Sequence, residues 1–250
     1  MRCQYLAALL AIFATTGGCA ADPLIDRYNT GVGDAAVATE GEIATDLVKV
    51  TKDNETLVWN ADKSRVLVVT WKAEGAYKSF IEGHNATSPS EDYVVWVTLA
   101  PKMQQRCQAF SAANPGAGSD GVNLYLKQFL GLYPEWNYDL FVELWVPPES
   151  LFRPCVDPQT DDSTCDLQFG NKVPAVTGIK DYKAFYEALY FKSFRYPPGV
   201  PWTGLGYTYN WGGNPSDGSE KGASEFILSP GTPYTVERTV PTAEYCAPKG

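Results

Sequence analysis

Short runs of apolar, β-branched and aromatic residues alternate along the chain with longer polar stretches. The two clearest run from Arg65 to Trp71 (RVLVVTW) and from Tyr93 to Leu99 (YVVWVTL). Each has the length and composition of a β-strand. Weaker runs of the same kind predict strands at 138–146, ended by two prolines, and at 224–229 and 234–238, on either side of Pro230–Gly231.

Three other segments have apolar residues at helical spacing. The first begins at Pro101, a residue favoured at the first helical position, and carries Met103, Cys107 and Phe110 on one face. The second, which Gly131 is placed to end, has apolar residues at 122, 125, 126, 129 and 130, and the third has them at 182, 185, 186, 189 and 190. Strands and helices are mixed without βαβ alternation. The sequence therefore predicts an α+β fold, with a mixed or antiparallel sheet and about three helices.

The first residues have the pattern of a secretory signal peptide. Arg2 supplies a positive charge, and an apolar run too short to span a bilayer extends from Tyr5 to Ala14. The small pair Gly17–Gly18 then precedes Cys19. This pair and cysteine resemble the lipobox of bacterial lipoproteins, although Thr16 stands where that motif usually has leucine.

The lipobox resemblance implies removal of residues 1–18 and acylation of Cys19, with palmitate or a similar chain as the membrane anchor. No other stretch is long and apolar enough to span a membrane, so attachment to the cell envelope would be through lipid. Cleavage near Ala20–Ala21 is the alternative and would give a secreted protein. Residues 19–55 are poor in aromatics, which predicts a loose tether, and residues 56–250 then form one α+β domain.

Four cysteines remain in the body of the chain, at positions 107, 155, 165 and 246. An even number in an exported protein predicts two disulfides, for which three pairings are possible. We favour Cys155–Cys165, which closes a local loop, and Cys107–Cys246, which ties the C-terminus to the body. A zinc site is the alternative, but the chain has no C-x-x-C pair and an exported protein lies in an oxidising compartment.

Charge and histidine content exclude several classes of function. The chain has 20 Lys and Arg against 29 Asp and Glu, a net charge of −9 at pH 7, so it has no basic excess with which to bind nucleic acid. The single histidine, His84, rules out multi-histidine metal sites. An acidic loop offers the oxygen ligands that Ca²⁺ prefers, but its spacing matches no EF-hand and favours a solvated loop: Asp157, Asp161, Asp162 and Asp166. We expect no metal and no firm cofactor.

The most unusual segment runs from Tyr196 to Gly213 and sets aromatic rings among glycines and prolines (YPPGVPWTGLGYTYNWGG). Rigid aromatic loops build ligand pockets, because flat rings supply contact area at low entropic cost. Trp202, Tyr207, Tyr209 and Trp211 are therefore the candidate binding residues for a small ligand, a glycan or a protein partner. Rings that simply cap the core beneath a long loop are the alternative.

Residues 221–236 resemble the last active-site strand of ADP-ribosyltransferases and related NAD-consuming enzymes, in which a glutamate precedes an apolar strand, a Pro/Gly turn and a returning strand. The resemblance implies that Glu225 is a catalytic carboxylate and NAD a substrate. Ala223 stands where arginine-modifying members carry Glu or Gln, and Arg65 and Arg153 are the candidates for the family's first-strand arginine. The whole chain also resembles exported bacterial proteins that carry a Trp-Thr-x-Leu-Gly-Tyr-Thr-Tyr core and a Ser-Glu-Phe strand, which implies a grouping without a mechanism.

A pair of carboxylates suggests a third function. Phe141, Glu143 and Trp145 alternate onto one face of a predicted strand, and a carboxylate between two rings is suited to a raised pKa. With Glu225 it would form the acid and base of a glycoside hydrolase, whereas an ion-paired or solvent-facing glutamate is the plainer interpretation. The sequence leaves open whether the protein is an enzyme, and it favours an exported envelope protein with an aromatic binding surface.

Overall fold

A six-stranded antiparallel sheet forms the centre of the protein in the computed structural model, which describes residues 22–248. The predicted signal peptide, residues 1–18, and Cys19 lie outside the described residues. The strand order is β4-β7-β2-β1-β3-β8. The bounds are Leu151–Phe152 (β4), Phe226–Leu228 (β7), Val95–Leu99 (β2), Val66–Lys72 (β1), Leu140–Val146 (β3) and Thr235–Pro241 (β8). A second sheet has two strands, β5 (Tyr207–Tyr209) and β6 (Lys221–Ser224).

Both faces of the large sheet are covered, because alternate residues of β1 point to opposite faces and both sets are apolar. Val66 and Val68 pack on one face with residues of β2, β3 and β7. Leu67 and Val69 pack on the other face, together with Phe129 of α4 (Gly118–Phe129). The continuous apolar run of this strand is the sequence signature of burial on both faces.

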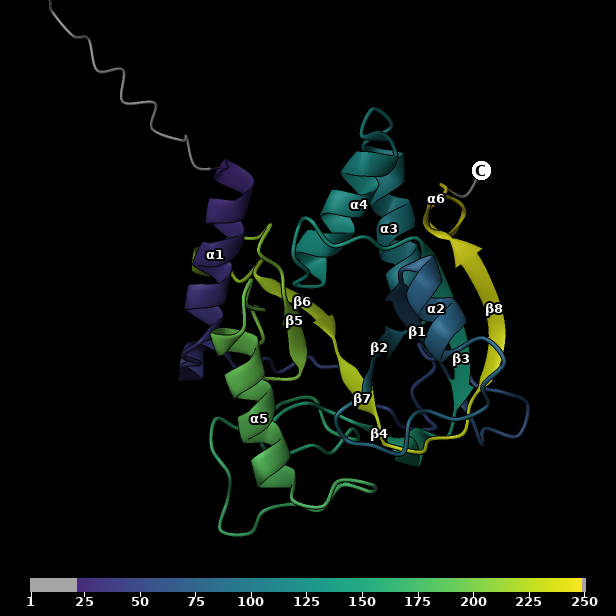
Figure 1. Cartoon of the computed structure of the whole chain (residues 1–250), viewed down its shortest axis with the longest axis vertical. Helices are drawn as coiled ribbons and strands as arrows, with labels where there is room; N and C mark the ends of the chain where they lie inside the picture. The colour runs from purple at the N-terminus through teal and green to yellow at the C-terminus, as the bar shows by residue number, and fades with distance from the viewer. Residues whose placement is uncertain (1–21, 249–250) are drawn as a thin grey trace, which may run out of the picture.

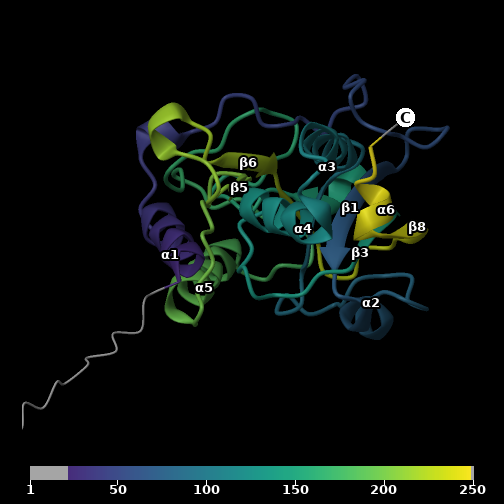
Figure 2. The same ribbon diagram turned by 90° about the horizontal axis from the view of Figure 1, so that it is seen from above.

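Three helices match the three that the sequence predicts: α3 (Lys102–Ala113), α4 and α5 (Tyr182–Arg195). The α+β fold with an antiparallel sheet is confirmed. The described chain also contains three helices that the pattern did not predict: α1 (Pro23–Ala35), α2 (Glu74–Phe80) and α6 (Thr242–Tyr245). In Figure 1 and Figure 2, α1, α5 and the two-stranded sheet lie at one side of the molecule and α2 and β8 at the other, with α3 and α4 between them.

The prediction of a loose tether needs correction for residues 22–55. Asp22 caps α1 by accepting a hydrogen bond from the Leu24 N–H at 2.9 Å. Tyr28 is fully buried, and its hydroxyl donates to the Gly199 carbonyl at 2.8 Å. Leu47 belongs to a buried cluster farther along the same segment. The segment itself is poor in aromatics, but rings from a distant loop supply the apolar surface against which it packs.

Both predicted disulfides are present. Cys107–Cys246 joins α3 to the chain just after α6, across a sequence separation of 139 residues. Cys155–Cys165 closes a local loop with a separation of 10 residues. Such bonds form in oxidising compartments and reinforce the fold. Within residues 22–248, no helix is both long and apolar enough to cross a membrane.

Candidate functional site

A cavity of about 390 Å³ lies against the face of the large sheet that α4 covers. Its floor is formed by β1 and β2, and its walls by the residues just after α4, the last turns of α5 and the aromatic loop around Trp202. Four of the seven tryptophans in the chain line it: Trp71, Trp96, Trp136 and Trp202. Tyr138 and Tyr209 add two more rings. Cavities of this size with mostly apolar walls that include several aromatic rings are typical of small-molecule sites.

Glu225 lies where one extended segment passes from the small sheet into the large one. β6 ends at Ser224 and β7 begins at Phe226, and Figure 1 shows the two strands in line. The Glu225 N–H donates to the Gly206 carbonyl at 3.0 Å, which fixes the backbone between the sheets. Side chains alternate along a strand, so Glu225 points away from the face that Phe226 occupies and lines the cavity.

The carboxyl group of Glu225 is buried without a partner. Its side chain is 7% exposed, and Oε1 has no hydrogen-bond partner. Burial raises the pKa of Glu225 to about 8, because the charged form loses its hydration. The group is therefore largely protonated at neutral pH and becomes an anion in mildly alkaline solution.

A second unpartnered polar atom, the indole Nε1 of Trp202, belongs to the same cavity wall. Buried polar atoms in native proteins almost always have a hydrogen-bond partner, and the exceptions call for an explanation. Two of the six such atoms within residues 22–248 belong to residues that line this cavity.

Backbone hydrogen bonds and one required glycine hold the aromatic loop against Glu225. The Thr203 hydroxyl donates to the Tyr207 carbonyl at 2.7 Å and accepts from the Leu205 N–H at 3.1 Å. Gly206 has a φ of +76°, and a Cβ at this position would lie 2.8 Å from the Cys165 sulfur. Only glycine fits there, so the turn that presents its carbonyl to Glu225 depends on this residue.

The four rings predicted as a binding surface are all buried, and they divide into two pairs. Trp202 and Tyr209 line the cavity. Tyr207 packs in a separate cluster and donates to the Glu42 carbonyl at 2.9 Å, while Trp211 packs on Tyr28 and donates to the Leu132 carbonyl at 3.0 Å. These two rings cap the core, as the alternative interpretation expected, and none of the four forms an exposed stacking surface.

Glu143 does not meet Glu225. It is buried in a bidentate ion pair with Arg238 of β8, with Nε–Oε2 and Nη2–Oε1 distances of 2.6 and 2.8 Å. The strand register places Glu143 beside Val69 and Val69 beside Thr98, and Glu225 follows on the next strand. Three strand spacings of about 4.8 Å separate the two carboxylates by roughly 14 Å. A glycoside hydrolase pair lies much closer, so this pair cannot act on one bond.

The expected ADP-ribosyltransferase arrangement around Glu225 is only partly present. β7 follows the glutamate, but the returning strand β8 pairs with β3 at the far edge of the sheet and not with β7. Neither candidate arginine lines the cavity. Arg65 donates to the Trp145 carbonyl at 3.1 Å, and Arg153 lies over the ring of Phe226, which faces away from Glu225.

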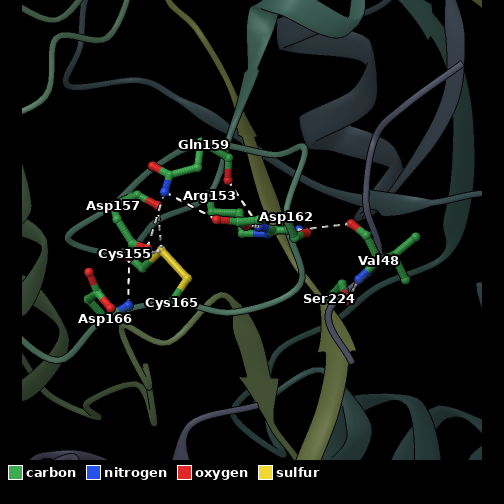
Figure 3. A network of polar contacts seen from close by, with 9 residues as sticks. All are labelled: Val48, Arg153, Cys155, Asp157, Gln159, Asp162, Cys165, Asp166 and Ser224. Atoms are coloured by element: carbon green, nitrogen blue, oxygen red, sulfur yellow. Dashed lines mark hydrogen bonds and ion pairs between the residues drawn. A yellow bond between two sulfur atoms is a disulfide. The ribbon is translucent and has the colours of Figure 1, made fainter. Parts of the chain in front are cut away.

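The acidic loop is organised around Arg153, as Figure 3 shows. The Arg153 guanidinium forms an ion pair with Asp162 and donates to the carbonyls of Val48 and Gln159, both at 3.0 Å. Asp157 accepts from the Asp166 N–H at 2.7 Å. Within residues 22–248, one group of three potential metal ligands is close together, but two of its members are the disulfide-bonded cysteines of this loop. Arg153 thus anchors the loop to the N-terminal segment, and the carboxylates of Asp157 and Asp162 form contacts within the loop.

No protein-family model, curated protein or solved structure matches this chain. The sequence indicated Trp202, Tyr209 and Glu225, because the first two lie in an aromatic loop and the third in a recognisable strand. Trp71, Trp96, Trp136 and Tyr138 carried no such signal. The alternation of the two main strands was sufficient to place Trp71 and Trp96 on a face, but not to show that both face one cavity.

Proposed function

We propose that the protein is a non-catalytic binding protein of the cell envelope whose cavity holds a small, largely apolar ligand. The observation that carries this proposal is the pair of unpartnered polar atoms, Glu225 Oε1 and Trp202 Nε1, on a cavity walled by aromatic rings. The rings supply contact area, and the two polar atoms orient the ligand.

The chemistry of the cavity supports binding over catalysis. Among the described residues that line it, Glu225 is the one carboxylic acid, and none is a histidine or a cysteine. Glycoside hydrolysis needs a second carboxyl group opposite the first, and here Glu143 lies about three strand spacings away. The remaining ionisable side chains of the wall are those of two lysines and two tyrosines: Lys72, Lys192, Tyr138 and Tyr209.

The location at the envelope rests on the first residues and on the disulfides. The signal-peptide pattern before Cys19 favours export, and the small pair at Gly17–Gly18 favours acylation of that cysteine. Two disulfides in the body agree with an oxidising compartment. A lipid on Cys19 would hold the cavity close to the membrane surface, where it would meet ligands of the extracytoplasmic space.

Binding can be tested with N-phenyl-1-naphthylamine, an uncharged dye whose fluorescence rises in apolar surroundings. We expect saturable binding to the oxidised protein, with quenching of tryptophan fluorescence because four tryptophans line the cavity. Trp202→Phe removes part of the ring contact and should weaken binding about tenfold, which corresponds to the roughly 1.5 kcal/mol upper range of a ring contact.

Trp211→Phe is the matched control, because it makes the same change in the same loop on a ring outside the cavity. Circular dichroism verifies that both variants fold. Binding by the control should remain within twofold of the parent protein. Failure of the dye to bind saturably, or an equal loss of affinity in both variants, would contradict the proposed site.

A further inference from the structure

The proposed function leaves the chemistry of Glu225 unexplained, since an apolar ligand does not need a carboxyl group. Burial of a carboxyl group without a partner costs free energy, and most when the group is ionised. An asparagine or glutamine could orient a neutral ligand without carrying an ionisable group. Glu225 is only 7% exposed, and its Oε1 has no hydrogen-bond partner in the protein. A group with this chemistry is suited to a ligand that carries the opposite charge.

The aromatic rings of the cavity that contains Glu225 also attract a cation. The face of an aromatic ring carries a negative partial charge, and tryptophan attracts a cation more strongly than tyrosine or phenylalanine. Trp71, Trp96 and Trp202 line the same cavity as the carboxyl group. Building on the proposed function, we infer that the ligand is an organic cation with a quaternary or methylated ammonium group, held by these rings and balanced by the carboxyl group of Glu225.

The other charged groups near the cavity do not already supply this counter-charge. The Lys192 ammonium is directed toward Asp92, with an N–O distance of 3.7 Å. Burial lowers the pKa of Lys72, and its ammonium forms no salt bridge within residues 22–248. The raised pKa of Glu225 has burial as its cause, without a contribution from either ammonium.

The two tyrosines of the wall are neutral. Burial raises the pKa of Tyr138 to about 12. The Tyr209 hydroxyl donates to Asp34 at 2.7 Å, and burial together with this bond raises its pKa further. The net charge of −9 also attracts cations to the molecule as a whole.

A methylated ammonium group fits this wall better than a primary one. A primary ammonium needs several hydrogen-bond acceptors, whereas a quaternary group needs none. The Thr208 hydroxyl on the wall is already engaged, since it donates to the Phe129 carbonyl at 2.7 Å and accepts from the Ala223 N–H at 2.9 Å. The aromatic rings of the wall can contact a quaternary group without hydrogen bonds.

The direction of the pH dependence separates a cation from a neutral ligand. A cation prefers the carboxylate, so its binding releases a proton from Glu225 and its affinity rises toward pH 8, by up to about tenfold per pH unit. A neutral ligand that accepts a hydrogen bond prefers the protonated acid, so its affinity falls as the pH rises through 8. Both directions of the pH dependence of affinity follow from the titration of Glu225, whose pKa is about 8.

The experiment is displacement of the bound dye by an isosteric pair, phenyltrimethylammonium and tert-butylbenzene, which differ in one nitrogen and its charge. At pH 8 we expect the cation to displace N-phenyl-1-naphthylamine at a concentration at least about tenfold lower than its neutral isostere. This advantage should shrink at pH 6. Glu225→Gln should abolish the advantage and its pH dependence while dye binding is retained.

Glu220→Gln is the matched control, because Glu220 is also buried with an unpartnered Oε2 but does not line the cavity. It should leave the preference for the cation unchanged. Equal displacement by the two isosteres, or a preference that survives Glu225→Gln, would overturn the cation assignment and leave the binding function intact. Absence of dye binding in the parent protein would instead contradict the binding function itself.

Discussion

At the scale of single residues, Glu225 combines a position fixed by the backbone with an environment that opposes its charge. Its N–H is bonded to Gly206 and its side chain points into an aromatic cavity. Side chains alternate along a strand, so once β7 has formed Glu225 must point to the face opposite Phe226. The sequence indicated the glutamate, but the absence of a hydrogen-bond partner for its Oε1 depends on which side chains the fold brings near.

Because the carboxyl group of Glu225 is buried, the stability of the folded state depends on pH. The pKa of Glu225 is about 8 in the folded protein and 4.5 in its ordinary state, so the folded state holds this proton more tightly than the unfolded chain. Stability should therefore decrease as the pH rises from about 4.5 to about 8 and then level off, with a total effect of up to about 5 kcal/mol. Urea unfolding at pH 5 and pH 8.5 measures this difference.

Glu225→Gln should remove most of the pH-dependent loss, so that the variant is more stable than the parent protein at pH 8.5 and nearly equal to it at pH 5. Glu149→Gln makes the same change at an exposed position and gives the baseline for loss of one carboxyl group. If the parent and Glu225→Gln proteins lose the same stability between the two pH values, Glu225 is not the group responsible.

At the scale of elements, the predictions from hydrophobic pattern succeeded where one segment contains the whole signal. The runs at 65–71 and 93–99 became β1 and β2, and the spacing at 182–190 became α5. The cavity could not be predicted in this way, because Trp71 and Trp96 face it together only when β1 and β2 are neighbours. Strand order depends on long-range packing, which the period of a single strand does not encode.

The packing of helix α1 also could not be predicted from its own segment of sequence. Its own residues are mostly small or polar, and the surface that it buries belongs to Tyr209 and Trp211, more than 170 residues later in the chain. A composition-based prediction therefore read this segment as loose. The Tyr209 hydroxyl bonds to Asp34 of α1, so the helix also supports one wall of the cavity.

Two glycines of α1 test whether this helix is docked. A Cβ at Gly31 would lie 2.9 Å from Tyr209 Cε1, whereas a Cβ at Gly33 would have no atom within 4 Å. Gly33→Ala should stabilise the protein by about 0.5–1 kcal/mol, because alanine favours a helix. Gly31→Ala should destabilise it by about 1–3 kcal/mol through overpacking. Thermal unfolding measures both, and equal effects at the two positions would mean that α1 is not packed on the rings.

At the scale of the whole molecule, the two disulfides constrain the chain over very different lengths. Cys107–Cys246 spans 139 residues and closes most of the folded body, while Cys155–Cys165 spans 10 residues and holds the loop around Arg153. Sequence spacing was enough to favour this pairing, since a short loop and a terminal tie are both common uses of disulfides. The cavity residues from Leu130 to Glu225 lie within the loop that the longer bond closes, whereas those on β1 and β2 precede that loop.

The difference in span predicts unequal contributions to stability. In the chain-entropy model the longer bond stabilises the folded state by about 5 kcal/mol and the shorter one by about 3 kcal/mol. All four cysteines are at most 2% exposed, so replacing either pair with alanine removes a similar amount of buried sulfur. Guanidinium unfolding of the two double variants should therefore show the larger loss for Cys107→Ala/Cys246→Ala. A larger loss for Cys155→Ala/Cys165→Ala would mean that the ion pair between buried Arg153 and partly exposed Asp162, which that loop holds in place, stabilises the protein more than closure of the long loop does.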